Sequence, residues 1–310
     1  MMRSTLLWLS QRQSIFNFVR RNGLAKKFAA RFVAGETIET AVQAAKELQA
    51  KGITVSLDLL GESVHNPAEA GQARDMYITI LRAMEAAGLE VNASMKPTQM
   101  GLDIDEALCE QNVRAVLDVA REIGAFVRLD MEGSAYTQRT LDFFYQKLFA
   151  EYGGHTGVVI QAALRRSTAD IEELIARQAR VRLCKGAYLE AADVAYPDKK
   201  DVDAHYLRLM EALLTRGNYP GIATHDEAII ALAKKFVADQ GIARDAFEFQ
   251  MLFGVRRDLQ EALVREGYRL RVYIPFGNQW YPYLMRRLAE RPANIVFIFG
   301  NVVKEAMNRS

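Results

Sequence analysis

Two hydrophobic rhythms alternate along this chain. Short runs rich in β-branched and aromatic residues recur about every 25–40 residues, and each is followed by a longer segment with helical periodicity. The runs predict strands at 55–60, 89–95, 126–129, 158–160, 181–184, 222–223, 247–252 and 270–274. The longer segments predict helices at 38–50, 67–87, 104–123, 136–152, 167–179, 202–215, 225–240, 256–266 and 282–291.

Strands that alternate with helices are typical of a parallel α/β fold. Eight such units favour a (β/α)8 TIM barrel over an open doubly wound sheet. Neither GxGxxG nor GxxxxGK[ST] follows any expected strand, which weakens the open-sheet nucleotide-binding interpretation. We expect one barrel domain at residues 35–310, preceded by an N-terminal helical arm at 1–34.

The last expected strand and helix carry the first candidate chemistry. Pro275 and Gly277 should stop the strand, and the chain should restart as a helix near Pro282. On that helix Tyr283 lies three and four residues before two arginines, so one face carries a phenol ring and two guanidiniums. The arginines are Arg286 and Arg287. Such a fork suits a small carboxylate with an apolar body, whereas a solvated basic face is the plain alternative. We expect this helix to lie over the barrel mouth.

Composition excludes several classes of protein. The net charge of +2 over 310 residues gives no general footprint for nucleic acid. Cys109 and Cys184 have no motif partner, which argues against disulfides and a cysteine zinc site and suits a reducing compartment. The histidines show no HExxH spacing, so we expect no metal. No apolar run approaches the roughly 18 residues of a membrane span.

The first 33 residues contain lysine and arginine but no acid, interleaved with large apolar residues. Three interpretations are open: a basic amphipathic helix on an anionic membrane, a transit peptide, or a helical arm docked on the domain. The apolar run at 6–9 is short for an h-region, which argues against a secretory signal.

Polar side chains gather at the carboxyl ends of the expected strands, where barrel enzymes place their chemistry. They are Asp58, Glu62, Lys96, Asp130, Glu132, Gln161, Arg182, Lys185, Thr224, His225, Gln250 and Tyr273. Each alone has a structural explanation; Asp130 and Thr224, for example, could cap helices. Their convergence on one rim predicts a functional site.

The cations among them, with the paired arginines, predict an anionic ligand. Lys96 or Lys185 could form a Schiff base in a lyase or aldolase barrel, although neighbouring acids oppose the lowered pKa that this needs. Alternatively, a cation such as Arg182 could stabilise a reduced flavin. Gly186 would allow close backbone approach, and the helix start at Thr224 would offer amide donors to phosphate. A barrel retained as an anion-binding module is the non-enzyme alternative.

Six segments together are similar to one family. They are residues 58–62 (DLLGE), 128–132 (RLDME), 182–188 (RLCKGAY), 223–226 (ATHD), 247–254 (FEFQMLFG) and 283–290 (YLMRRLAE). In this order they resemble the proline dehydrogenase family, including the proline-oxidising part of bifunctional proline utilisation A. The resemblance covers about residues 35–300. It resembles the short monofunctional bacterial type.

The resemblance implies a distorted (β/α)8 barrel that holds FAD. It implies oxidation of L-proline to 1-pyrroline-5-carboxylate, the first step of proline catabolism to glutamate, with electrons passed from the flavin to a membrane quinone. Asp130 and Arg182 would be catalytic, with Asp130 in the substrate-side polar network and Arg182 near the flavin ring. Residue by residue, Lys96, Arg286 and Arg287 would hold the proline carboxylate, and Tyr188, Leu252, Tyr273 and Tyr283 would surround its ring. Met131, Gln161, Arg182, Lys185, Gly186, Ala187, Thr224, His225 and Glu290 would contact FAD.

Two residues depart from the family pattern, namely Pro97 after Lys96 and Ala163, where an aromatic residue is expected.

Two further expectations concern Glu62 and the N-terminal segment. Glu62 should pair with Arg286 or Arg287 and gate the site, because adjacent guanidiniums over a partly dry pocket are costly. Because a quinone lies in the membrane, contact of residues 5–33 with the membrane surface is as plausible as docking of this segment on the barrel. We expect a cytoplasmic protein, with peripheral contact on the inner face of the cell membrane as one interpretation. The sequence does not specify an oligomeric state.

Overall fold

The chain forms a closed barrel of parallel strands. The structure, a computed structural model, describes residues 29–290, with side chains through Met285. Each strand pairs with the next along the chain, and the last pairs with the first. The strands are β1 (Thr54–Leu59), β2 (Asn92–Met95), β3 (Phe126–Leu129), β4 (Thr156–Gln161), β5 (Arg180–Cys184), β6 (Gly221–Ala223), β7 (Glu248–Leu252) and β8 (Leu270–Phe276). The predicted barrel and the positions of its strands are confirmed.

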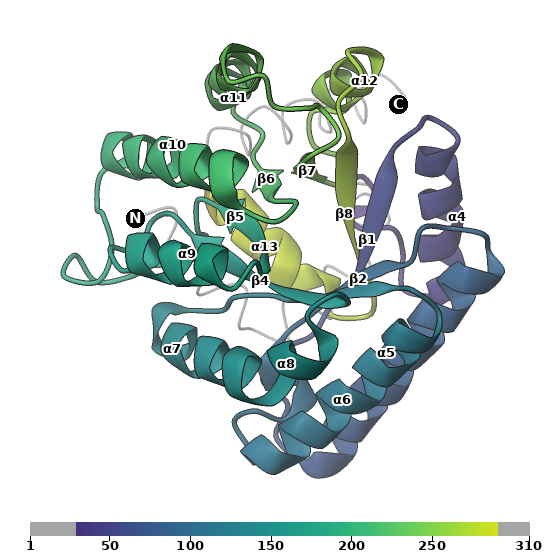
Figure 1. Cartoon of the computed structure of the whole chain (residues 1–310). Helices are drawn as coiled ribbons and strands as arrows, with labels where there is room; N and C mark the ends of the chain where they lie inside the picture. Colours follow the sequence, from purple (N-terminus) through teal and green to yellow (C-terminus); the bar gives the residue numbers. More distant parts are fainter. Residues whose placement is uncertain (1–28, 291–310) are drawn as a thin grey trace, which may run out of the picture.

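Helices form a ring around the strands, and the last helix lies across the centre of that ring in the view of Figure 1. The helices are α4 (Ile38–Gln49), α5 (Pro67–Ala86), α6 (Glu106–Glu122), α7 (Ser134–Phe143), α8 (Phe149–Tyr152), α9 (Ser167–Ala176), α10 (Lys199–Arg216), α11 (Glu227–Asp239), α12 (Arg257–Arg265) and α13 (Trp280–Glu290). Two short turns complete the set: a 3₁₀ turn, η1 (Pro97–Met100), and a π turn, η2 (Phe144–Leu148). The helix expected at 136–152 is therefore interrupted by a π turn.

Side-chain caps set where several helices begin. The Asn66 side chain accepts from the amide of Glu69 at 3.0 Å, with Pro67 in the first turn of α5. At α11 the cap is Asp226, whose carboxylate accepts from the amide of Ala228 at 3.2 Å. The suggestion that Thr224 caps this helix is wrong, because the Thr224 hydroxyl instead accepts from the amide of Asp226.

The apolar core lies between the barrel and its helices. Outward strand residues such as Leu57, Val127 and Val272 are buried, in one cluster with the inner faces of helices, including Tyr77 and Ile80 of α5. Burial of this shell is the main source of stability, at about 25 cal/mol per Å² of apolar surface.

The inside of the barrel is polar. Arg182 of β5 bonds to Ser94 of β2, to Asp130 after β3 and to Gln250 of β7, none of which is on a strand neighbouring β5. These bonds can form only across the barrel interior. Barrel interiors are usually filled by branched apolar side chains, so this one departs from the common pattern.

The last strand continues past the expected stop. Pro275 pairs with Asp58 of β1, and β8 ends at Phe276 rather than at residue 274. The proline is tolerated because its missing N–H is not needed, while its carbonyl accepts from the amide of Ala34 at 3.0 Å. Gly277, with φ of +118°, does end the strand as expected.

Helix α13 is held over one end of the barrel. Trp280, Tyr281 and Leu284 are buried against Leu60, which follows β1, and Val33. The Trp280 indole N–H also donates to the Glu36 carboxylate at 3.0 Å. Most of the predicted arm at 1–34 lies outside the described residues. Within residues 29–290, no helix is both long and apolar enough to cross a membrane.

We predict that Gly157→Ala destabilises the protein. The added Cβ would lie 2.3 Å from the carbonyl oxygen of Arg180 and 3.0 Å from the Phe126 ring, so β4 must shift. The expected loss in the free energy of unfolding is about 1–3 kcal/mol, measured by urea denaturation. Gly154→Ala is the control, since its Cβ meets nothing within 4 Å. Equal stability of the two variants would contradict this packing.

Candidate active site

A cavity of about 1260 Å³ opens at the carboxyl ends of the strands, beneath α13. This volume exceeds that of a typical small-molecule pocket and is large enough for a dinucleotide-sized cofactor together with a small substrate. Among the residues predicted to form the site, its walls include Asp58, Glu62, Lys96, Asp130, Met131, Gln161, Arg182, Lys185, Gly186, Ala187, Tyr188, Thr224, His225, Gln250, Leu252, Tyr273 and Tyr283. The structure therefore brings nearly all of the predicted set to one place.

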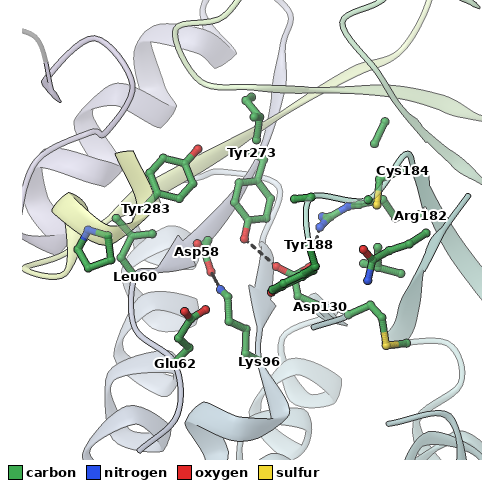
Figure 2. Close-up of a pocket in the computed structure, with 18 of the residues that line it drawn as sticks. Asp58, Leu60, Glu62, Lys96, Asp130, Arg182, Cys184, Tyr188, Tyr273 and Tyr283 are labelled. Atoms are coloured by element: carbon green, nitrogen blue, oxygen red, sulfur yellow. Dashed lines mark hydrogen bonds and ion pairs between the residues drawn. The ribbon is translucent and has the colours of Figure 1, made fainter. Parts of the chain in front are cut away.

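Asp130 receives two hydrogen bonds at the centre of this mouth (Figure 2). It follows β3 directly, and its backbone amide donates to the carbonyl of Met95, which extends the strand ladder by one residue. Arg182 donates to Oδ1 at 2.8 Å, and the Tyr273 hydroxyl donates to Oδ2 at 2.7 Å. The carboxylate is thus fixed on both oxygens, in charge-assisted bonds that are stronger than neutral ones.

Arg182 is fixed on three sides. Besides Asp130, it donates to Gln250 Oε1 at 2.5 Å and to the Ser94 hydroxyl at 3.0 Å. Its guanidinium carbon lies 5.1 Å from the centroid of the Tyr273 ring, a favourable cation–π contact. Burial and the two neighbouring carboxylates hold the pKa of the Tyr273 hydroxyl well above its ordinary value, so this hydroxyl acts as a hydrogen-bond donor.

Lys96 forms a buried ion pair with Asp58 at 2.9 Å, which Figure 2 shows beside Asp130 and Tyr273. The Asp58 side chain is only 1% exposed, and burial raises the pKa of its carboxyl even though Lys96 pulls it back. For Lys96, burial lowers the pKa, but attraction by Asp58 and Asp130 outweighs this and raises it above the ordinary value. A lysine held in its charged form is a poor Schiff-base nucleophile, so this geometry disfavours the lyase interpretation at Lys96.

Lys185 lies in a second ion-pair group on the cavity wall. Its ammonium is 2.5 Å from Asp203 of α10 and 2.9 Å from Asp226, and Lys199 pairs with Asp203 as well. Asp203 and Asp226 are not among the residues that the sequence predicted for the site. Asp226 directly follows Thr224-His225 and could have been found, whereas nothing local marks Asp203.

Gly186 makes a tight turn against the end of β4. Its φ is +105°, and a Cβ there would lie 3.0 Å from Gln161 Oε1 and 3.2 Å from Ala163 Cβ. Glycine is therefore needed for both conformation and space. The small Ala163, noted as a departure from the family pattern, leaves room for this turn. The result is exposed backbone beside Gln161, suitable for close approach of a planar ligand.

Two other predictions are corrected or left open. Glu132 is wrong as a rim residue: it is buried beneath η1, where it accepts from the amide and the hydroxyl of Thr98. Burial raises the pKa of its carboxyl, partly offset by those bonds. The side chains of Arg286, Arg287 and Glu290, on α13, lie outside the described residues, so the predicted pairing of Glu62 with an arginine stays a prediction.

The described lining contains cations, two buried ion pairs and aromatic rings. Within residues 29–285 there is no group of three or more His, Cys, Asp or Glu side chains that could hold a metal ion. Fixed cations stabilise negative charge that develops on a ligand. The fold and the site together define a (β/α)8-barrel enzyme built for an anionic ligand with a planar or apolar part.

Comparison with known proteins places the chain within that class. The family model for proline dehydrogenase matches residues 41–298. The chain is 44% identical over 306 residues to proline dehydrogenase of Deinococcus radiodurans and 41% identical over 305 residues to proline dehydrogenase 1 of Bacillus subtilis, covering 97% and 98% of this chain and 98% and 100% of those proteins. The chain belongs to the proline dehydrogenase family, as the six segments predicted.

A solved structure agrees with this assignment. Proline utilization A from Bdellovibrio bacteriovorus, inactivated by N-propargylglycine, superposes with a TM-score of 0.80 at 27% identity over 90% of this chain. The chain covers 34% of that longer protein. The family assignment implies an oxidoreductase that uses a flavin and takes proline as its substrate.

We predict that Lys96→Met leaves Asp58 as an unpaired buried carboxylate. The free energy of unfolding should fall by about 3–5 kcal/mol near neutral pH. Without Lys96 the pKa of Asp58 rises further, and a raised folded pKa means stability that is present at low pH and lost as pH rises. The deficit should therefore be larger at about pH 8 than at about pH 5.

Urea denaturation at both pH values measures this, with Asp58→Asn/Lys96→Met as the matched control. The double variant should recover much of the loss and lose the pH dependence. A deficit that does not change with pH would contradict the buried pair.

Proposed function

We propose that this chain oxidises L-proline to 1-pyrroline-5-carboxylate with FAD as its flavin, in the first step of proline catabolism to glutamate. The observation that carries the proposal is the convergence of Arg182 and Tyr273 on Asp130, next to the Lys96–Asp58 pair, at the mouth of a barrel of this family. This arrangement provides fixed positive charge for both an anionic substrate and a reduced cofactor.

The cavity walls suit a flavin. Gly186 supports this proposal, because its exposed backbone beside Gln161 has no side chain and would allow a planar ring to approach closely. Residues proposed to hold FAD are Met131, Gln161, Arg182, Lys185, Gly186, Ala187, Thr224, His225 and Glu290. The bound flavin would supply a hydride acceptor, and Arg182 would stabilise the negative charge that it gains.

Proline is proposed to bind between α13 and the rim. Arg286, Arg287 and Lys96 would hold its carboxylate through charge-assisted bonds, each worth about 1.5–3 kcal/mol. Tyr188, Leu252, Tyr273 and Tyr283 would enclose the pyrrolidine ring and reject larger amino acids. Lys96 can serve here because Asp58 keeps it charged.

In this mechanism the residues of the chain bind, orient and exclude water. The clamp on the carboxylate would orient the proline ring, so that the carbon next to the ring nitrogen is the one presented for oxidation. Asp130 keeps Arg182 in place, and α13 covers the mouth. The substrate nitrogen must be neutral, because its lone pair forms the new C=N bond as the hydride leaves.

We also propose a gate and an electron acceptor. Glu62, on the cavity wall, would pair with Arg286 or Arg287 when substrate is absent. Finding Glu62 farther than about 8 Å from both arginines, with and without ligand, would exclude such a pair.

A membrane quinone would reoxidise the flavin, and the basic segment 5–33 would bring a cytoplasmic protein to the inner face of the cell membrane. Vesicle sedimentation of the full chain against a form lacking residues 1–33 separates membrane binding from simple docking.

The visible spectrum tests the function most simply. Purified protein should be yellow, and L-proline added without oxygen should bleach the flavin band. A colourless protein that borohydride traps with a carbonyl substrate would instead support the Schiff-base alternative at Lys96 or Lys185.

We predict that Arg286→Met weakens proline binding. Loss of one charge-assisted bond to the carboxylate should raise KM about 10–100-fold while kcat falls less. Steady-state kinetics with an artificial acceptor measures both constants. Arg177→Met is the control, because Arg177 is an exposed residue that pairs with Glu173 on the outer ring of helices. Equal KM values for the two variants would contradict the proposed clamp.

Activity should also depend on pH through the substrate. Because a protonated amine has no lone pair to donate, kcat/KM should rise with pH until proline is deprotonated. A pH profile of kcat/KM checks this. A flat profile across the ionisation of the amine would oppose direct hydride transfer from neutral proline.

A further inference from the structure

The hydrogen bonds that hold Arg182 continue down through the barrel interior. Gln250 accepts from Arg182 through its Oε1 and donates through its Nε2 to Glu248 Oε1, with both distances at 2.5 Å. Glu248 in turn forms an ion pair with Arg271 at 2.8 Å, and both side chains are 3% exposed. Glu248 begins β7 and Arg271 is second in β8, so this Glu248–Arg271 floor pair lies at the opposite end of the strands from the cavity.

The charge of Glu248 determines which way the Gln250 amide faces. Burial by itself raises the pKa of Glu248, but attraction by Arg271 and its hydrogen bonds outweigh burial and lower it below its ordinary value. An ionised carboxylate can only accept hydrogen bonds. It therefore selects the NH₂ end of Gln250, and the oxygen end must point to Arg182.

The surroundings of Gln250 are shaped for this role. A Cβ on Gly221, in the neighbouring strand β6, would lie 2.5 Å from Gln250 Nε2. Glycine at this position leaves the space that the amide occupies. Since the φ of Gly221 is not in the left-handed region, space rather than backbone conformation is what the glycine provides.

The floor pair is itself anchored. The Tyr219 hydroxyl donates to Glu248 Oε2 at 3.2 Å, from a residue with φ of +45°, which is unusual for a bulky side chain. Arg271 donates to the carbonyl of Val55 at 2.7 Å and, on its outer side, pairs with Glu90, which is 61% exposed. Glu248 thus accepts hydrogen bonds on both carboxylate oxygens, whereas Glu90 accepts from Nη2 of Arg271.

We propose that Glu248 and Gln250 are positioning residues that fix the direction of the Arg182 guanidinium at the cavity, so that a charge at the barrel floor controls the flavin at its mouth. This inference rests on the proposed function. Without the ionised Glu248, the Gln250 amide would lose the acceptor that holds its NH₂ end, and its oxygen would be held less firmly against Arg182. Arg182 would then move away from the position that stabilises negative charge on the reduced cofactor.

The test compares Glu248→Gln with Glu90→Gln in the flavin-loaded enzyme. Both substitutions remove one carboxylate next to Arg271, but only Glu248→Gln alters the hydrogen bonds that run from Glu248 through Gln250 to Arg182. For Glu248→Gln we expect a lower flavin midpoint potential and a rate constant for flavin reduction by saturating proline that is about ten-fold slower, with the Kd of proline within about two-fold. Glu90→Gln should match the wild type in all three.

A purely structural role would lower the thermal midpoint without moving the potential, and that result would overturn the proposal. Identical potentials and reduction rates for the two variants would overturn it as well. If Glu248→Gln does not fold, Gly221→Ala carries the same test, because it displaces Gln250 without removing a charge. A wild-type protein that lacks flavin or is not reduced by proline would refute the proposed function instead, so the two failures are distinguishable.

Discussion

Charged side chains inside a barrel need partners of opposite charge and hydrogen bonds close by. Asp130 is the residue at which such a paired group borders the cavity. A buried carboxylate is costly unless it is paired and hydrogen-bonded. Asp130 meets that condition by accepting from both Arg182 and Tyr273, and the Lys96–Asp58 pair meets it one strand away. The side chains that place charge at the cavity mouth are therefore themselves held in paired hydrogen bonds and ion pairs.

A polar barrel interior is compatible with a stable fold because the apolar core lies between the strands and the surrounding helices. The shell between strands and helices buries the outward strand residues, so the interior need not supply hydrophobic stabilisation. It can carry Arg182, Gln250, Glu248 and Arg271 in a connected line instead. Buried polar networks are favourable only when their members are satisfied, and the space left by Gly221 is one feature that satisfies this network.

The sequence predicted the barrel and most of the rim for one physical reason. Parallel strands all present their carboxyl ends to one side, so the polar residues that end each run must converge, as Asp58, Lys96 and Asp130 do. What failed depended on contacts that no local pattern encodes. Glu132 is buried under η1, where it accepts from the Thr98 hydroxyl, and Asp203 pairs with Lys185 from α10, 18 residues further along the chain. Helical spacing singled out Tyr283, Arg286 and Arg287, whereas Tyr188, Leu252 and Glu290 were assigned to the site only by family resemblance, which periodicity alone could not supply.

The most direct test of the account is the coupling between Asp130 and Arg182. Unfolding free energies of the wild type, Asp130→Asn, Arg182→Met and the double variant form a double-mutant cycle. If Asp130 balances the buried guanidinium, each single variant should be strongly destabilised, and the cycle should show a coupling of about 1.5–3 kcal/mol. Losses that simply add, with no coupling, would show that the two charges are stabilised independently and would contradict the central claim.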